Sequence, residues 1–237
     1  MSFGTFEHKL SRIVAQLDNP ERALNTHAIE AQAFVFFDTN QNELPAWLLY
    51  HRVICLIDGD NAPTDDYVQH CRAQFGPGFT PADHLQLECD RLIGTARCAK
   101  LIGSPSMALA VAERFIGIRD ELLAVANSDP AWTAQAHYAY GRTTHVAHLE
   151  DVAHLSFRLA CEGWKSLGDN PDDVRVGRSL VFLLRSALEL GAITPDEIDE
   201  TRHRLLHAHP AYWKNYGQKL MHDKNGLGWF SQLDIRW

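Results

Sequence analysis

The residues of this sequence with the most evident chemical potential are histidines and carboxylates spaced at helical intervals. Residues three or four positions apart lie on one face of a helix, so His148, Asp151 and His154 would form a stripe of metal ligands. Glu200 and His203 have the Glu-x-x-His spacing that helical bundles use to bind two iron or manganese ions. The candidate dinuclear site consists of Glu30, Glu88, Asp151, His154, Glu200 and His203.

A dinuclear centre of this type uses two Glu-x-x-His motifs and a carboxylate from each of two further helices. This chain has one such motif, and Asp151-x-x-His154 would have to replace the second. Histidines on polar helix faces are common, and short motifs often occur without a site. A helical metalloenzyme with iron or manganese is therefore the alternative function, and it requires these side chains to converge on one point.

A second candidate is Asp58-Gly59-Asp60-Asn61, which follows an apolar run from Val53 to Ile57. A strand followed by Asp-x-Asp resembles haloacid-dehalogenase-type phosphatases, and this resemblance implies Asp58 as a nucleophile beside Mg²⁺ and Asp60 as a general acid. Such enzymes need several parallel strands, but no segment after Asn61 alternates or is rich in β-branched residues. We favour a buried helix that ends at Gly59, with a turn after it.

Other catalytic motifs are missing from the sequence. The five cysteines are odd in number and include no Cys-x-x-Cys pair, which argues against disulfides and a structural zinc site. No phosphate-binding loop, His-Glu-x-x-His motif or Gly-x-Ser-x-Gly turn is present. We see no signal peptide and no apolar run near the ~20 residues that span a bilayer. These features predict a cytoplasmic protein without a catalytic residue.

The elements that would position these residues are marked by proline. Six of the ten prolines follow Asn, Ser, Thr or Asp, which are the preferred N-cap residues of helices. These pairs are Asn19-Pro20, Thr80-Pro81, Ser104-Pro105, Asp129-Pro130, Asn170-Pro171 and Thr194-Pro195. Apolar residues recur between them at steps of three and four, which predicts an all-α protein.

We expect about ten helices in antiparallel hairpins. The first covers about Thr5 to Leu17, and the one from Thr80-Pro81 reaches about Ile102 before Gly103. A break near Gly141-Arg142-Thr143-Thr144 should separate the seventh helix from the eighth. No linker or low-complexity segment divides the chain, so residues 1–237 are expected to form one domain.

Part of the chain looks repetitive. Pro130, Pro171 and Pro210 lie 41 and 39 residues apart, and each interval reads as a helix, a turn and a second helix. The spacing of Ala153, Phe157 and Ala160 resembles the second helix of a tetratricopeptide repeat. Residues 131–210 are the most repeat-like, although their period exceeds the family period of 34 and the first-helix aromatic positions are not both filled.

The resemblance implies a short right-handed α-solenoid with a concave surface for a peptide or protein; an irregular helical bundle is the alternative. Helices on the inner side would supply the contacts. The aromatic segment 211–237 would either add a binding surface or, as we favour, cap the last hairpin. Candidate contact residues are Tyr138, His145, Arg178, Arg185 and Trp213.

The charge of the chain narrows the class of partner. With 22 Lys and Arg against 30 Asp and Glu, the net charge is −8, which disfavours nucleic acid. A basic protein or peptide fits better. We therefore predict a non-catalytic adaptor, chaperone or inhibitor of the immunity-protein type that recognises another polypeptide. The sequence does not decide the oligomeric state.

Overall fold

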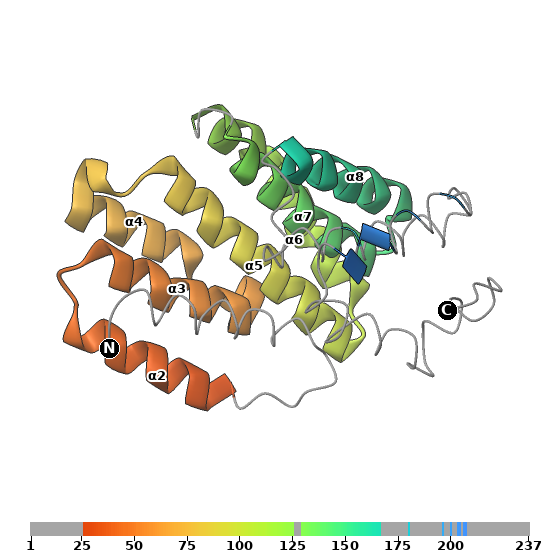
Figure 1. Ribbon diagram of the computed structural model, residues 1–237. Helices are drawn as coiled ribbons and strands as arrows, with labels where there is room; N and C mark the ends of the chain where they lie inside the picture. Colours follow the sequence, from red (N-terminus) through yellow and green to blue (C-terminus); the bar gives the residue numbers. More distant parts are fainter. Residues whose placement is uncertain are drawn as a thin grey trace.

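The computed structural model describes residues 26–125 and 129–166, together with seven single positions closer to the C-terminus. Those positions are Leu180, Asp196, Glu200, His203, Arg204, Leu206 and His207. Within this part of the chain every regular element is helical and there is no strand (Figure 1). None of the helices described there is long and apolar enough to cross a membrane. The all-α prediction is confirmed for these residues.

Seven α-helices and two short 3-10 helices are present in the described residues. They are α2 (Thr26–Thr39), α3 (Leu44–Asp58), η1 (Gly59–Asn61), α4 (Thr64–Phe75), η2 (Gly76–Gly78), α5 (Pro81–Ile102), α6 (Pro105–Val125), α7 (Pro130–Val146) and α8 (Glu150–Ser166). The predicted first helix lies outside the described residues, as do the segments 167–179 and 211–237. Of the two helices predicted from Asn170 and Thr194, only the seven single positions are described, and each of these is helical.

Local sequence signals set the ends of these helices. Pro81, Pro105 and Pro130 each occupy the first helical position, as predicted. Before α5, Thr80 Oγ1 accepts a hydrogen bond from the Asp83 amide, and the Asp83 carboxylate accepts one from the Thr80 amide. Gly103 ends the same helix in the left-handed conformation.

The predicted break near Gly141–Thr144 is wrong, because α7 continues through it to Val146. Gly141 lies against the ring of Phe157 on α8, and a Cβ at this glycine would come within 2.7 Å of that ring. The glycine therefore allows close helix packing instead of forming a turn. The chain turns later, at 147–149, where His148 has a φ of 61°.

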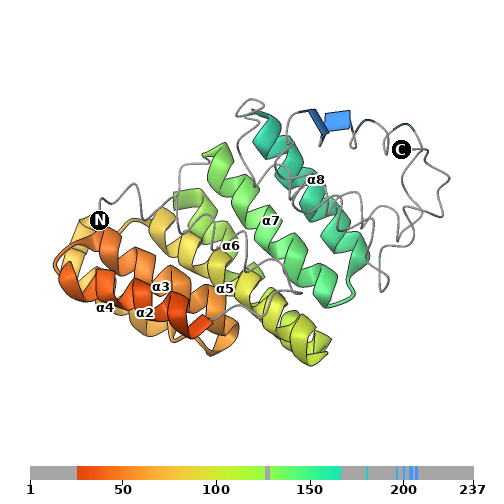
Figure 2. The same cartoon turned by 60° about the horizontal axis from the view of Figure 1, so that its bottom comes forward.

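The helices follow one another across the molecule from α2–α4 at one side to α8 at the other (Figure 2). Helices α3, α5 and α7 contact one another in succession, and α4, α6 and α8 each pack against the helix that precedes them. Helices α4 and α6 also contact the helix that follows. The main contacts therefore join helices that are first or second neighbours in the sequence.

Helices α3 and α5 approach each other closely at two glycines. A Cβ at Gly94 would lie 2.1 Å from the carbonyl oxygen of Cys55, and Gly59, with a φ of 59°, lies against the backbone of Thr95. Only glycine fits this contact, since any side chain would occupy the space of the other backbone. The contact holds α5 at the centre of the molecule, where it touches α3, α4, α6 and α7.

Candidate functional site

The central position of α5 buries residues that would normally face solvent. From Leu87 to Ala96 every residue of this helix is buried, including Glu88, Asp90 and Arg91. A buried charge is costly unless it is paired and hydrogen-bonded. These three side chains therefore need partners close by.

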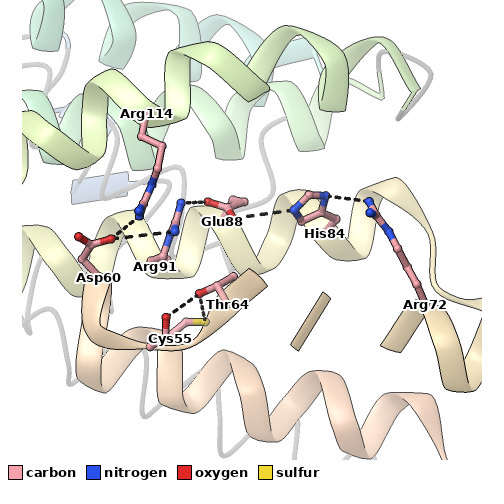
Figure 3. A network of polar contacts seen from close by, with 9 residues as sticks. Cys55, Asp60, Thr64, Arg72, His84, Glu88, Arg91 and Arg114 are labelled. Atoms are coloured by element: carbon pink, nitrogen blue, oxygen red, sulfur yellow. Dashed lines mark hydrogen bonds and ion pairs between the residues drawn. The ribbon is translucent and has the colours of Figure 1, made fainter. Parts of the chain in front are cut away.

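Glu88 is the centre of a row of charged groups that crosses the interior (Figure 3). Its carboxylate accepts a hydrogen bond from the guanidinium of Arg91, one turn further along α5. On the other side, Nε2 of His84 lies 3.8 Å from Glu88, while Nδ1 of His84 faces Arg72 of α4 at 3.4 Å. Because arginine can only donate, Nδ1 accepts, and the proton of the ring is directed at Glu88.

The row continues from Arg91 to the surface. Nη1 of Arg91 lies 4.0 Å from Asp60 of η1, and Asp60 also accepts a hydrogen bond from Arg114 of α6 (Figure 3). The side chains of Asp60 and Arg114 are 31% and 47% exposed. Opposite charges thus alternate from Glu88 through Arg91 and Asp60 to the exposed Arg114. Together with the contact between His84 and Arg72, the row links α4, α5, η1 and α6.

Asp90 has partners on the opposite side of α5. Its carboxylate accepts hydrogen bonds from Arg52 of α3 at 2.7 Å and from Gln86 at 3.1 Å. Burial raises the pKa of Asp90, while the charge and hydrogen bond of Arg52 oppose the rise. The pair fixes α3 to α5 on the side away from Glu88.

The thiols near this interior are not activated. Burial raises the pKa of Cys55 to about 12, and Cys55 Sγ lies 3.6 Å from the hydroxyl of Thr64 (Figure 3). Burial also raises the pKa of Cys71 to about 11 and that of Cys161 to about 12. These thiols are protonated at neutral pH, so they supply neither a thiolate nucleophile nor a ready metal ligand.

A second unusual feature is a cluster of rings between α2, α3 and α4, which we call the aromatic cluster. Its members are Phe34, Phe37, Trp47, Tyr50, His51, Tyr67, His70 and Phe75. The ring centroids of Phe37 and Tyr50 are 5.1 Å apart, and those of Trp47 and His70 are 4.4 Å apart; both pairs are stacked. The cluster reaches solvent, since Phe34 is 48% exposed and Trp47, Tyr50 and Tyr67 are half-buried.

His51 is the polar centre of the aromatic cluster. It is 4% exposed and stacks on Tyr67 with 3.7 Å between ring centroids. Neither of its ring nitrogens has a hydrogen-bond partner among the described residues. Burial, together with the charge of His70, lowers the pKa of His51 to about 4, so the ring is neutral at physiological pH.

The six candidate metal ligands are all described, and they do not converge on one site. Glu88 is paired with Arg91 and His84, whereas Glu30 is half-buried on α2 and Asp151 is exposed on α8. His154 is half-buried on α8, and Glu200 and His203 are exposed. Nowhere in the part of the chain that the structure describes do three His, Cys, Asp or Glu side chains group as metal ligands.

The candidate contact residues are placed as follows. Tyr138 is 1% exposed, within the core between α7 and α8, and its ring centroid lies 6.3 Å from that of Phe157. His145 is 8% exposed and pairs with Glu150 at 2.7 Å across the turn between α7 and α8. Both therefore belong to the interior, and their expected place on a binding surface is corrected. Arg178, Arg185 and Trp213 lie outside the described residues.

Asp58 and Asp60 lie where a helix ends. Asp58 is the last residue of α3 and Asp60 belongs to η1, so the predicted helix ending at Gly59 is confirmed. No strand precedes them within the described residues, and Asp60 is bonded to Arg114. This arrangement does not match the strand-based site of a phosphatase.

Sequence reasoning missed Arg91, Asp90, Arg114 and His51. His84 and Glu88 are four residues apart, a spacing that places them on one face of a helix, but Asp60 and Arg114 are 54 residues apart and come together only through packing. His51 gave no signal, since one histidine within an apolar helix has no diagnostic spacing.

No protein-family model, curated protein or solved structure matches this chain.

Proposed function

We propose that this chain is a non-catalytic helical scaffold that binds another polypeptide, as an adaptor, chaperone or inhibitor. The succession of α3–α4, α5–α6 and α7–α8 supports the proposal, because stacked hairpins build extended binding surfaces. The paired charges along α5 support it as well. They join α5, η1 and α6 and so favour a rigid frame over a mobile one.

The observation that carries the proposal is the solvent access of the aromatic cluster. Trp and Tyr contribute much of the binding energy at protein interfaces, because they bury large areas with few rotatable bonds. The indole of Trp47 is held in place by a 2.6 Å hydrogen bond to the carbonyl of Gln41 and by stacking on His70. Such rings are ordered before a partner arrives, which lowers the entropic cost of binding.

The surroundings of the aromatic cluster favour a basic partner. Glu30 and Asp58 both lie near enough to Tyr50 to raise its pKa, in addition to the larger effect of burial. The chain as a whole carries a net charge of −8. A polypeptide with Lys or Arg beside an apolar anchor would match both the rings and the carboxylates, and binding should then weaken as salt is added.

The test is site-specific photo-crosslinking with benzoylphenylalanine in place of Phe34, followed by reconstitution with the purified captured protein. Val125, which is 55% exposed on α6, provides the control position. We expect Phe34→Ala and Tyr50→Ala each to weaken the reconstituted complex by about fivefold or more, and Val125→Ala to leave it unchanged. Equal crosslinking at both positions, or equal loss of affinity in all three variants, would remove the support for this surface.

A further inference from the structure

Helix α8 has two apolar faces. Its inner face, with Phe157 and Trp164, is buried in the core beside α7. Away from that face, Val152, Leu155 and Leu159 have exposed fractions of 37%, 58% and 37%. Their spacing of three and four residues places them in one stripe along the helix. A continuous exposed stripe of large apolar side chains is typical of an interaction surface.

Charged residues of both signs run beside this stripe. Asp151 and Arg158 are exposed and lie seven residues apart, so they share one flank of α8. Neither forms an ion pair with the residues that the structure describes. Asp151, with the negative charge, lies beside the start of the stripe. Arg158, with the positive charge, lies beyond Leu155, which is the middle residue of the stripe.

This pattern is complementary to itself when reversed. If a second α8 lies antiparallel, with a two-fold axis at Leu155, then Leu155 meets its own copy. Val152, three residues before the axis, then lies within one residue, or about 1.5 Å, of the level of Leu159 of the second copy, four residues after it. In the same register Asp151 faces Arg158 of the second copy, and the two-fold axis repeats that pair. An interface between two copies related by a two-fold axis requires such self-complementarity, whereas an interface with an unrelated protein does not.

We propose that two copies of this chain associate through α8, antiparallel and in this register. The stripe supplies the buried apolar area, and the two symmetric Asp151–Arg158 pairs select the antiparallel orientation. The surface lies on α8 and is separate from the aromatic cluster on α2–α4. Dimerisation and the binding proposed for that cluster are therefore independent.

The first experiment is sedimentation equilibrium of the full chain over a concentration series, with thermal unfolding to confirm the fold of each variant. We expect a reversible dimer that Leu155→Glu converts to monomer at every concentration. Leu101→Glu is the matched control, because Leu101 is also 58% exposed but lies on α5. It should leave the dimer unchanged. A monomeric wild type, or a dimer that survives Leu155→Glu, overturns the proposal; the stripe would then serve another segment or another protein.

The second experiment tests the register by charge reversal. In the homodimer of either Asp151→Arg or Arg158→Asp, like charges face each other at both symmetric contacts. Each variant alone should therefore dimerise about tenfold more weakly than the wild type. Mixing the two variants should restore the wild-type affinity, because both symmetric pairs again join opposite charges. A mixture that dimerises no better than the separate variants overturns the antiparallel register.

Discussion

Replacing Gly94 by alanine sets two opposing effects against each other. In the interior of a helix, alanine is favoured over glycine by about 1 kcal/mol. At Gly94, however, the new Cβ would lie 2.1 Å from the carbonyl oxygen of Cys55 and 3.0 Å from that of Leu56. Both are backbone atoms of α3, so neither can rotate away. Helices α3 and α5 would have to separate by about 1 Å to reach ordinary contact.

The clash should outweigh the helical preference. Forcing extra volume into a packed core costs about 1–3 kcal/mol, and more where backbone must move. Gly94→Ala is therefore expected to lower the free energy of unfolding by about 2 kcal/mol. Gly117 is the matched control, since it also lies inside a helix but a Cβ there would meet nothing within 4 Å. Gly117→Ala should raise the free energy of unfolding by about 1 kcal/mol.

The two variants can be compared by urea unfolding followed by circular dichroism, with thermal unfolding as a second measurement. A change of 1 kcal/mol in a chain of this size moves the melting temperature by about 2–4 °C. The variants should therefore shift in opposite directions, with a difference of about 3 kcal/mol between them. If Gly94→Ala is as stabilising as Gly117→Ala, the two backbones are not in contact and the central packing of α5 is wrong.

Two further predictions concern buried polar groups. Since burial lowers the pKa of His51 to about 4 from an ordinary 6.5, the unfolded chain takes up a proton first as the pH falls. The free energy of unfolding should therefore decrease by about 3 kcal/mol as the pH falls from about 6.5 to about 4. His51→Phe should remove that part of the pH dependence in urea titrations, and an unchanged profile would contradict the burial of His51. Glu88→Leu leaves the Arg91 charge buried and should cost about 3–5 kcal/mol, whereas Glu88→Leu with Arg91→Leu should recover most of it. A double variant as unstable as the sum of the two single variants would show that the pair is not coupled.

The ends of several helices were determined by the sequence alone. Pro81, Pro105, Pro130 and Gly103 act through backbone geometry that is local to each residue, so their effect does not depend on the rest of the fold. Gly141 shows the limit of this reasoning. Glycine permits both a turn and a close approach, and only the position of Phe157 on α8 decided in favour of the approach.

The candidate sites depended on tertiary structure to a greater extent. Helical spacing placed His84 beside Glu88, but the same spacing equally allowed Glu88 to be a metal ligand. Its role follows from its burial among other helices, because a buried carboxylate needs a partner and both Arg91 and His84 lie beside it. The link from Arg91 through Asp60 to Arg114 joins three elements, and Asp60 and Arg114 are 54 residues apart, so no local pattern encodes the contact. The exposed stripe of α8 depends on both the sequence and the tertiary structure. Its periodicity is a local property of the sequence, but the packing of α7 decided which of the two apolar faces stays exposed.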